Sequence, residues 1–231
     1  MRILIILIVG SFLLTACGPQ KKEINEGKSL YNGKNLDGWR FYKDKENNSW
    51  EVAADGSLHC KPFDGNEKRA NLITTDQYEN FELNWEWKIS AQGNSGVMFR
   101  VTEEYDEPYL SGPEYQLLDD IGYPGKVEDF HKSASDFGMY PSSAAKPKSV
   151  GEWNSSKMVV NVNHVEYWLN DAKVVEYELG SEDWQKRKVA SKWNDAVGYG
   201  AAKKGYICLQ DHGGEVWFRN IVIKTFDSQA K

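Results

Sequence analysis

Apolar and polar side chains alternate strictly along FELNWEWKI at residues 81–89. A repeat of two residues predicts a half-buried β-strand, because successive side chains of a strand point to opposite faces. The next segment, GNSGVMFRV at 93–101, opens with a Gly-Asn turn signal. It predicts a second strand, on which Met98 and Arg100 share the face turned away from the core.

The C-terminal half continues in strands. KMVVNVNHVEYWLNDAKVVEYEL at 157–179 predicts a three-stranded meander with Asn-His and Asn-Asp turns. GYICLQDHGGEVWFRNIVIKTF at 205–226 predicts a hairpin that turns near His212. Many short strands at this spacing are typical of an all-β sandwich of antiparallel sheets.

SEDWQKRKVASKW at 181–193 breaks the strand pattern. Ser181 stands where a helix N-cap is expected, and two acidic residues follow in the first turn, where the helix dipole favours them. We therefore predict one short helix near 181–193. Residues 121–150 are rich in Gly, Pro, Ser and Ala and predict a long irregular loop, which in a compact domain is commonly functional.

The N-terminus sets the expected cellular context. An apolar run follows Arg2 and is shorter than the about 20 residues that span a bilayer. Together with Leu-Thr-Ala before Cys17, it predicts a bacterial lipoprotein signal peptide over 1–16 and lipidation of Cys17. Residues 17–28 would form a lipidated tether and 29–227 a single membrane-anchored domain. Because no acidic cluster follows the cysteine, we expect the periplasmic side of the envelope rather than the cell surface.

Cysteine count and charge narrow the function classes. Besides the lipidated residue only Cys60 and Cys208 remain, and two cysteines make no disulfide framework even in an exported protein. Two separate buried thiols are favoured over a pair. The 28 Lys and Arg against 34 Asp and Glu give a formal charge of −6 without a basic block, which argues against nucleic acid. Nine Trp and twelve Tyr suit a β-rich core and also a sugar-binding surface.

The sequence contains no familiar nucleophile, zinc or phosphate-loop motif, so a candidate site rests on polar residues near strand ends. GPEYQLLDD at 112–120 puts Glu114 and Gln116 on one strand face. A buried Glu can have a raised pKa and act as general acid or base; a solvated face is the alternative. Asp119 and Asp120 can cap a turn, bind a cation such as calcium or orient a cationic partner, with capping favoured.

Further candidates lie in loops and at turns. Arg100 is either a surface charge or a fixed cation for an oxyanion or a sugar hydroxyl. Gln210 and His212 share one side of LQDHGG, whose glycines allow a ligand to approach closely. This makes His212 a stronger proton-transfer candidate than His131 in the long loop. Trp153 either stacks on a sugar or closes the core.

Six motifs together resemble a known family. They are LYNGKNLDGWRF at 30–41, GNSGVMFR at 93–100, GPEYQLLDD at 112–120, VGEWN at 150–154, EYWLND at 166–171 and GYICLQDHGGEVWFRNIVI at 205–223. Over residues 29–226 the chain resembles the 3-keto-disaccharide hydrolases, a family of 3-keto-glucoside 1,2-lyase and 3-keto-2-hydroxyglucal hydratase domains. Such proteins are frequent as lipoproteins in gut Bacteroidetes. The loop HKSASDFGMYP, with Asp136 and Phe137, departs from the family's small-residue run ending in GALY.

The resemblance implies a concanavalin-A-like jelly roll of two antiparallel sheets and an enzyme with a small carbohydrate substrate. A ketone at C3 acidifies the C2 hydrogen, a base removes it, the C1 substituent leaves and water adds to the 2-hydroxyglucal. By matching position we expect these residues to serve: Glu114 as acid or base, His212 as second proton-transfer group, His131 in reserve, Arg100 and Gln116 on substrate oxygens, Gln210 in binding, and Asp119 as orienter or metal ligand. No cofactor is assigned, a divalent cation such as calcium is left open, and no protein partner is predicted.

A non-catalytic, lectin-like glycan-binding lipoprotein is the alternative function, because the same fold hosts lectins. In that case Tyr115, Trp153 and Trp168 would stack on glycans, and carboxylates would bind calcium or hydroxyl groups. A structural lipoprotein with an exposed apolar face is a third, weaker interpretation.

Overall fold

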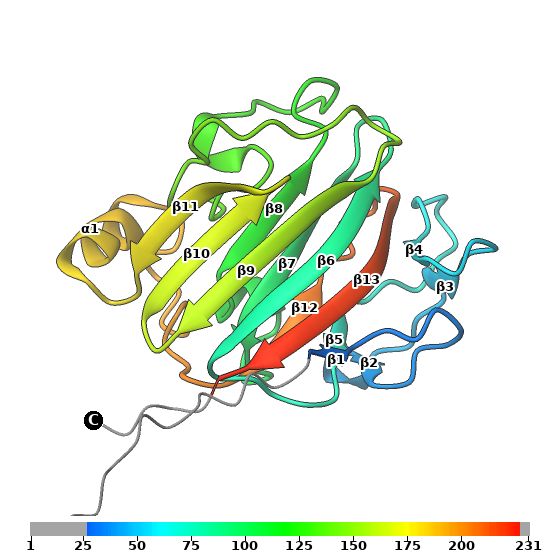
Figure 1. Cartoon of the computed structure of the whole chain (residues 1–231), viewed down its shortest axis with the longest axis horizontal. Helices are drawn as coiled ribbons and strands as arrows, with labels where there is room; N and C mark the ends of the chain where they lie inside the picture. Colours follow the sequence, from blue (N-terminus) through cyan, green and yellow to red (C-terminus); the bar gives the residue numbers. More distant parts are fainter. Residues whose placement is uncertain (1–26, 227–231) are drawn as a thin grey trace, which may run out of the picture.

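Two antiparallel β-sheets pack face to face in the computed structural model, which describes residues 27–226 (Figure 1). The predicted signal peptide over 1–16 and the lipidation site Cys17 lie outside these residues. In the larger sheet the strand order is β11-β10-β9-β6-β13-β4-β3, with β1 beside β13. In the smaller sheet it is β2-β5-β12-β7-β8. The predicted all-β sandwich is confirmed.

The strands have the following bounds. The larger sheet consists of β1 (Lys28–Ser29), β3 (Trp50–Val52), β4 (Leu58–Cys60), β6 (Phe81–Ile89), β9 (Asn154–Asn161), β10 (His164–Leu169), β11 (Ala172–Glu178) and β13 (Val216–Thr225). The smaller sheet consists of β2 (Trp39–Phe41), β5 (Leu72–Thr74), β7 (Asn94–Val101), β8 (Glu114–Leu118) and β12 (Tyr206–Leu209). Short 3-10 turns are η1 (Tyr42–Asp44), η2 (Pro108–Leu110) and η3 (Asp129–His131).

Most aromatic side chains of the described residues are buried in the core. Along β6 every apolar position is buried and every polar one is half-buried, as the alternation predicts. Two aromatic groups meet at one hydroxyl: Trp87 Nε1 donates to Ser156 Oγ at 2.8 Å, and the Tyr115 hydroxyl lies 2.8 Å from the same oxygen. The aromatic excess is therefore largely explained by the core, and Tyr115 belongs to it.

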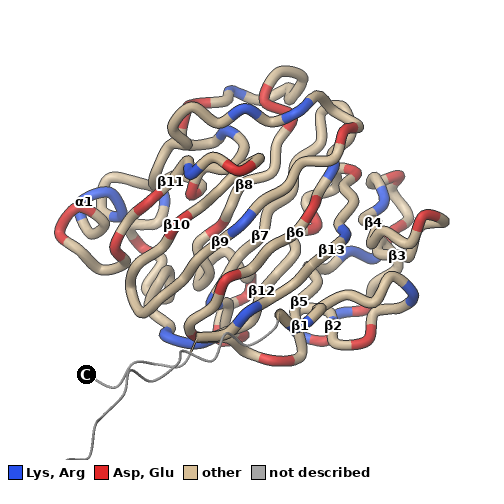
Figure 2. The backbone as a smooth tube through the Cα atoms, in the orientation of Figure 1, with Lys and Arg blue, Asp and Glu red and all other residues tan. Residues whose placement is uncertain are grey.

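Helix α1 (Glu182–Ala190) is the only α-helix within the described range, and the helix prediction is confirmed. Ser181 Oγ accepts a hydrogen bond from the backbone N of Trp184 at 3.2 Å, which is the expected N-cap. Across residues 27–226 no helix has the length and apolar character needed to cross a membrane. Acidic and basic residues are interspersed over both sheets and the loops (Figure 2).

The C-terminal hairpin predicted for 205–226 is wrong. Strand β12 pairs with β5 and β7 in the smaller sheet, whereas β13 pairs with β6 and β4 in the larger one. The segment around His212 therefore connects the two sheets instead of closing a tight turn. Cys60 in β4 and Cys208 in β12 are buried free thiols in different sheets, as favoured from the sequence.

Candidate functional site

A polar row on the outer face of the smaller sheet is centred on Gly96. On β8, Tyr115 and Leu117 belong to the core between the sheets, so Glu114 and Gln116 face outward. Gly96 pairs with Gln116 on one side, and its carbonyl accepts from the backbone N of Gln210 at 2.9 Å on the other. Three strand segments thus meet at a residue without a side chain.

The carboxyl group of Glu114 occupies the space that Gly96 leaves open. A Cβ atom built on the glycine would stand 2.0 Å from Glu114 Oε1. Glu114, Gln116 and Gln210 are only 3%, 2% and 8% exposed. The Oε1 atom of each has no hydrogen-bond partner within the described part of the chain. Buried acceptors are normally satisfied, so the unpartnered oxygens of these three side chains are suited to a ligand that brings hydroxyl donors.

Burial raises the pKa of the Glu114 carboxyl group to about 8. The ammonium group of Lys192 opposes this shift, and Asp136 adds to it. Glu114 is therefore mostly protonated at neutral pH, which suits a general acid.

Lys192, which was not predicted from the sequence, places a positive charge that acts on Glu114, His131 and His212. Its Nζ atom lies 4.0 Å from the ring centroid of Phe137 and 4.3 Å from that of Trp193. Its positive charge acts on Glu114 and lowers the pKa values of His131 and His212, which burial lowers more strongly. In the sequence this lysine merely extends the basic end of α1, so no signal marked it.

His131 and His212 lie in different loops and contact different parts of the protein. The His131 ring in η3 packs 4.5 Å from Phe130 and 4.8 Å from Phe137, measured between centroids. His212 keeps part of its surface exposed although the surrounding protein desolvates its imidazole, and its neighbour Asp211 is anchored in the protein. The Asp211 carboxylate accepts from Ser49 Oγ at 2.6 Å, and it forms an ion pair with Arg69 in which its side chain is 0% exposed.

A pocket of about 360 Å³ opens beside the His212 loop. Its lining combines an aromatic ring, a cation and the loop itself: Phe63, Arg69, Asp211, His212 and Gly213. Phe63 is 59% exposed, and the Arg69 guanidinium lies over its ring at 5.7 Å from the centroid. A sugar ring can use such a surface because its apolar face packs on aromatic rings.

Asp136, in the loop over residues 121–150, pairs with Tyr115 of β8. The loop runs along β8, where the backbone N of Phe137 donates to the Glu114 carbonyl at 3.0 Å. Asp136 is fully buried, and the Tyr199 hydroxyl donates to its Oδ1 at 3.1 Å. Burial raises the pKa of Asp136 to about 7, because the hydrogen bonds that favour its anion are outweighed by desolvation.

Arg100 does not occupy the face assigned to it by simple alternation. The register between β7 and β12 shifts at this point, and Arg100 has φ of 53°, so a bulge interrupts the alternation. Its Nη2 donates to the carbonyls of Glu79 at 3.1 Å and Val162 at 2.6 Å. The guanidinium therefore ties the smaller sheet to the β9–β10 turn of the larger one, and the prediction of its face is wrong.

Asp119 and Trp153, also predicted for the site, both contact other groups of the protein. Asp119 accepts from the backbone N atoms of Gln92, Ile121 and Gly122 at 2.8, 3.2 and 2.9 Å. This is the turn cap favoured from the sequence. Trp153 lies under the Arg219 guanidinium at 4.0 Å from the ring centroid, and Arg219 is on β13 of the larger sheet.

Comparisons with known proteins agree over most of the chain. The sequence profile of the 3-keto-alpha-glucoside-1,2-lyase-like domain matches residues 26–224. A 3-keto-disaccharide hydrolase of Bacteroides thetaiotaomicron is 36% identical over 228 residues, which cover 86% of this chain and 78% of the relative.

Solved structures support the same fold. A candidate glycosyl hydrolase from Parabacteroides distasonis is 38% identical with a TM-score of 0.78, covering 86% of this chain and 93% of its own. A galectin-like protein from Bacillus subtilis, at 14% identity, has a TM-score of 0.55 and covers 89% of this chain and 97% of its own. The latter likeness concerns the fold alone and agrees with a jelly-roll sandwich.

Proposed function

The chain belongs to the 3-keto-alpha-glucoside-1,2-lyase-like family, and on that premise we propose that it is an enzyme that cleaves or hydrates 3-keto-glycosides. Membership supports a carbohydrate-active function. The observation that carries the finer proposal is the buried Glu114 carboxyl, with its raised pKa, beside unpartnered amide oxygens and within the field of Lys192. This set supplies proton transfer without a covalent nucleophile.

The first step removes the hydrogen at C2 of the 3-keto-sugar. The lowered pKa of His212 leaves its imidazole neutral and able to accept that proton. The electron pair moves toward the C3 carbonyl and forms an enediolate, and Lys192 provides a positive charge for its oxygen. This assigns to Lys192 the role expected of Arg100 from the sequence.

Collapse of the enediolate then expels the substituent at C1. Glu114, protonated in the free protein, donates its proton to the departing oxygen, so that the leaving group departs as an alcohol. The products of this step are a 2-hydroxyglucal, the alcohol, a Glu114 carboxylate and a His212 imidazolium.

Hydration uses the same two groups in the opposite sense. The Glu114 carboxylate accepts a proton from water as the oxygen adds at C1, and the His212 imidazolium returns its proton to C2. The amides of Gln116 and Gln210 are suited to bind sugar hydroxyls, because each amide both donates and accepts. His131 remains the second candidate for the proton acceptor at C2. We further propose that the protein is exported, lipidated at Cys17 and held at the periplasmic side of the envelope.

Two substrates test the proposal on the purified protein. A 3-keto-glucoside reports elimination, and 2-hydroxy-3-keto-glucal reports hydration, with 3-keto-glucose as the expected product of both. Each incubation is run with and without a chelator. Failure to convert either compound, combined with binding of an unmodified glycan, would overturn the enzyme and support the lectin alternative.

A further inference from the structure

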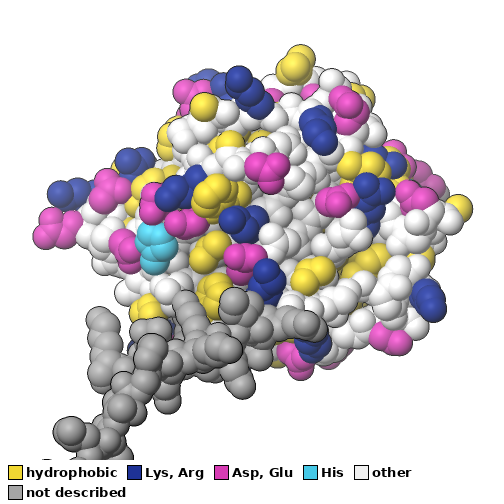
Figure 3. All heavy atoms as spheres, in the orientation of Figure 1, with side chains coloured by type: hydrophobic (Ala, Val, Ile, Leu, Met, Phe, Trp, Pro, Cys, Tyr) yellow, Lys and Arg dark blue, Asp and Glu magenta, His cyan; other side chains and the backbone are white. Residues whose placement is uncertain are grey.

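A histidine surrounded by acidic side chains stands on the outer face of the larger sheet, over β10 and β11 (Figure 3). His164 pairs with Glu178 across the two strands, and Glu166 pairs with Glu176. Since residues two apart on a strand share a face, these four side chains form a square on one surface. The square lies on the larger sheet, whereas Glu114 faces outward from the smaller one.

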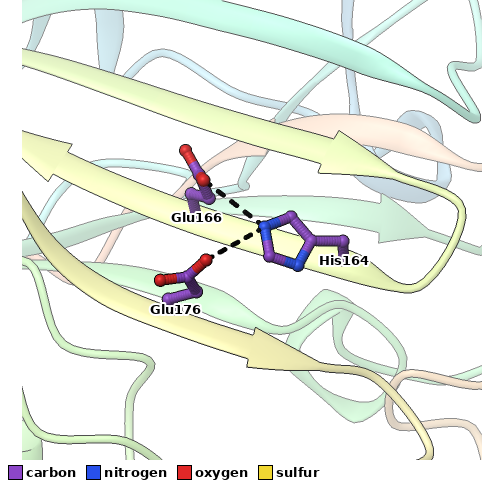
Figure 4. Close-up of side chains that lie close together, drawn as sticks. All are labelled: His164, Glu166 and Glu176. Atoms are coloured by element: carbon purple, nitrogen blue, oxygen red, sulfur yellow. Dashed lines mark hydrogen bonds and ion pairs between the residues drawn. The ribbon is translucent and has the colours of Figure 1, made fainter.

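Three of the four side chains converge on one point (Figure 4). His164 Nε2 lies 3.3 Å from Glu166 Oε1 and 3.3 Å from Glu176 Oε1. The possible ligand atoms of these three residues all lie within 4.8 Å of one another. An imidazole nitrogen and two carboxylate oxygens are a ligand set that binds divalent transition metals such as Zn²⁺.

The fourth side chain orients the histidine. His164 Nδ1 lies 2.7 Å from Glu178 Oε1 and can donate its proton there, which leaves Nε2 facing the other two carboxylates. Metal-binding histidines commonly have such a carboxylate partner on the second nitrogen. In the metal-free protein an Nε2 proton can meet these carboxylates, and a bound metal ion would replace that proton.

Both carboxylate ligands are also held by outer partners. Trp168 Nε1 donates to Glu166 Oε2 at 2.8 Å, and Lys173 Nζ donates to Glu176 Oε2 at 2.6 Å. These two bonds go to Oε2, and each Oε1 faces His164. Lys173 Nζ also lies 3.4 Å from Glu166 Oε1. The cluster of three carboxylates and one ammonium has a net negative charge when the imidazole is neutral, which attracts a cation.

His59 provides an internal contrast on the same sheet. It also contacts two carboxylates, but Glu51 lies 3.0 Å from Nδ1 and Glu215 lies 3.0 Å from Nε2. The two anions are therefore on opposite sides of the ring, which stacks on Trp217 at 4.8 Å. No nitrogen of His59 faces two carboxylates, so acidic neighbours alone do not produce the His164 arrangement.

We propose that His164, Glu166 and Glu176 bind one divalent transition-metal ion of the Zn²⁺ class. The ion would join β10 to β11, the last strand of the larger sheet, and leave its remaining coordination positions to water. Because it binds the folded sheet and not the unfolded chain, it would stabilise the protein. The site is independent of the glycoside chemistry proposed above.

Zinc titration of the untagged, chelator-treated protein by calorimetry tests the site. We expect one Zn²⁺ per chain and a saturable rise in melting temperature. His164→Ala and Glu176→Gln should abolish both, and Glu178→Gln should weaken binding by about 10- to 100-fold, as loss of an outer partner does elsewhere. His59→Ala is the matched control and should bind zinc like the wild type.

Three results would overturn the proposal. They are the absence of zinc binding to the wild type, equal binding by His164→Ala, and binding of Ca²⁺ as tight as that of Zn²⁺. The last would exclude the transition-metal class, since calcium prefers oxygen ligands. Each variant changes a side chain on the sheet surface, and circular dichroism checks that the variants remain folded.

Discussion

The carboxyl group of Glu114 lies over Gly96, whose absent side chain gives it room: a Cβ atom there would stand 2.0 Å from Oε1 and 2.7 Å from the carboxyl carbon. Gly96→Ala should displace Glu114 while leaving the strand intact. A displacement of this kind can cost about 100-fold in turnover. Steady-state kcat/KM on a 3-keto-glucoside measures the loss, and the melting temperature confirms folding. A folded alanine variant with unchanged kcat/KM would show that Glu114 does not act from this position.

Glu114→Gln should abolish turnover and retain sugar binding. The amide matches the shape and neutrality of the protonated carboxyl but cannot give up a proton, and general acid–base catalysis typically contributes about 100-fold or more. Calorimetric binding and product formation are measured on the same preparation. Glu46→Gln, an exposed acid on the protein surface, is the control and should retain both properties. Equal turnover by Glu114→Gln would exclude its catalytic role.

Stability should fall as pH rises from about 4 to about 7, in part because of Asp136. Its pKa is raised to about 7 in the folded state, so the folded protein retains a proton that the unfolded chain has already released. The free energy of unfolding therefore decreases with pH across this window, by up to about 1.4 kcal/mol per pH unit for one group.

Asp136→Asn should reduce this slope. The free energy of unfolding of the variant, relative to that of the wild type, should therefore be higher at pH 8 than at pH 5. Urea unfolding at a series of pH values measures the effect. Glu114→Gln should act in the same direction up to about pH 8, the raised pKa of that carboxyl. An unchanged slope in Asp136→Asn would mean that Asp136 is ionised in the folded protein.

Lys192→Met should lower kcat by about 10- to 100-fold if its charge stabilises the enediolate. The same change removes a charge that lowers the pKa values of Glu114, His131 and His212, so all three should rise. The pH profile of kcat/KM and the histidine NMR titrations report this shift. Lys186→Met, on an exposed turn of α1, is the matched control. Equal effects in both variants would contradict a specific role.

The Arg69–Asp211 ion pair should support the His212 loop. Because the Asp211 side chain is fully buried, Arg69→Met leaves an uncompensated buried charge, which typically costs about 3–5 kcal/mol. Urea unfolding measures the loss. Arg69→Met combined with Asp211→Asn should recover much of it, since no charge then remains buried. A double variant as unstable as the single one would show that packing of the arginine dominates.

The sequence was sufficient where local chemistry determines structure. Alternation along 81–89 and the Ser181 cap predicted β6 and α1, because side-chain period and N-cap hydrogen bonds are local properties. The separation of β12 from β13 was missed, since two strands joined by a glycine-containing segment read alike whether they pair or change sheets. Only packing against β7 and β6 decides between these outcomes.

Only those parts of the candidate site that depend on local spacing were predicted from the sequence. Glu114 and Gln116 share a strand face by their spacing, and the structure places Gln210 next to Gly96 with them. Arg100 was misplaced because one bulge reverses the alternation. Lys192 was missed because it lies far from Glu114 along the chain, and nothing in its neighbours marks a tertiary contact.

Glu114 and Gln116 belong to a strand of the smaller sheet, whereas His131, Lys192 and His212 come from three separate loops. The acidic group is thus built into the least changeable part of the domain, and its helpers belong to the parts that tolerate insertion and exchange. Proteins of this fold can therefore acquire new sugar preferences through changes in these loops, while the strand that carries Glu114 and Gln116 stays the same.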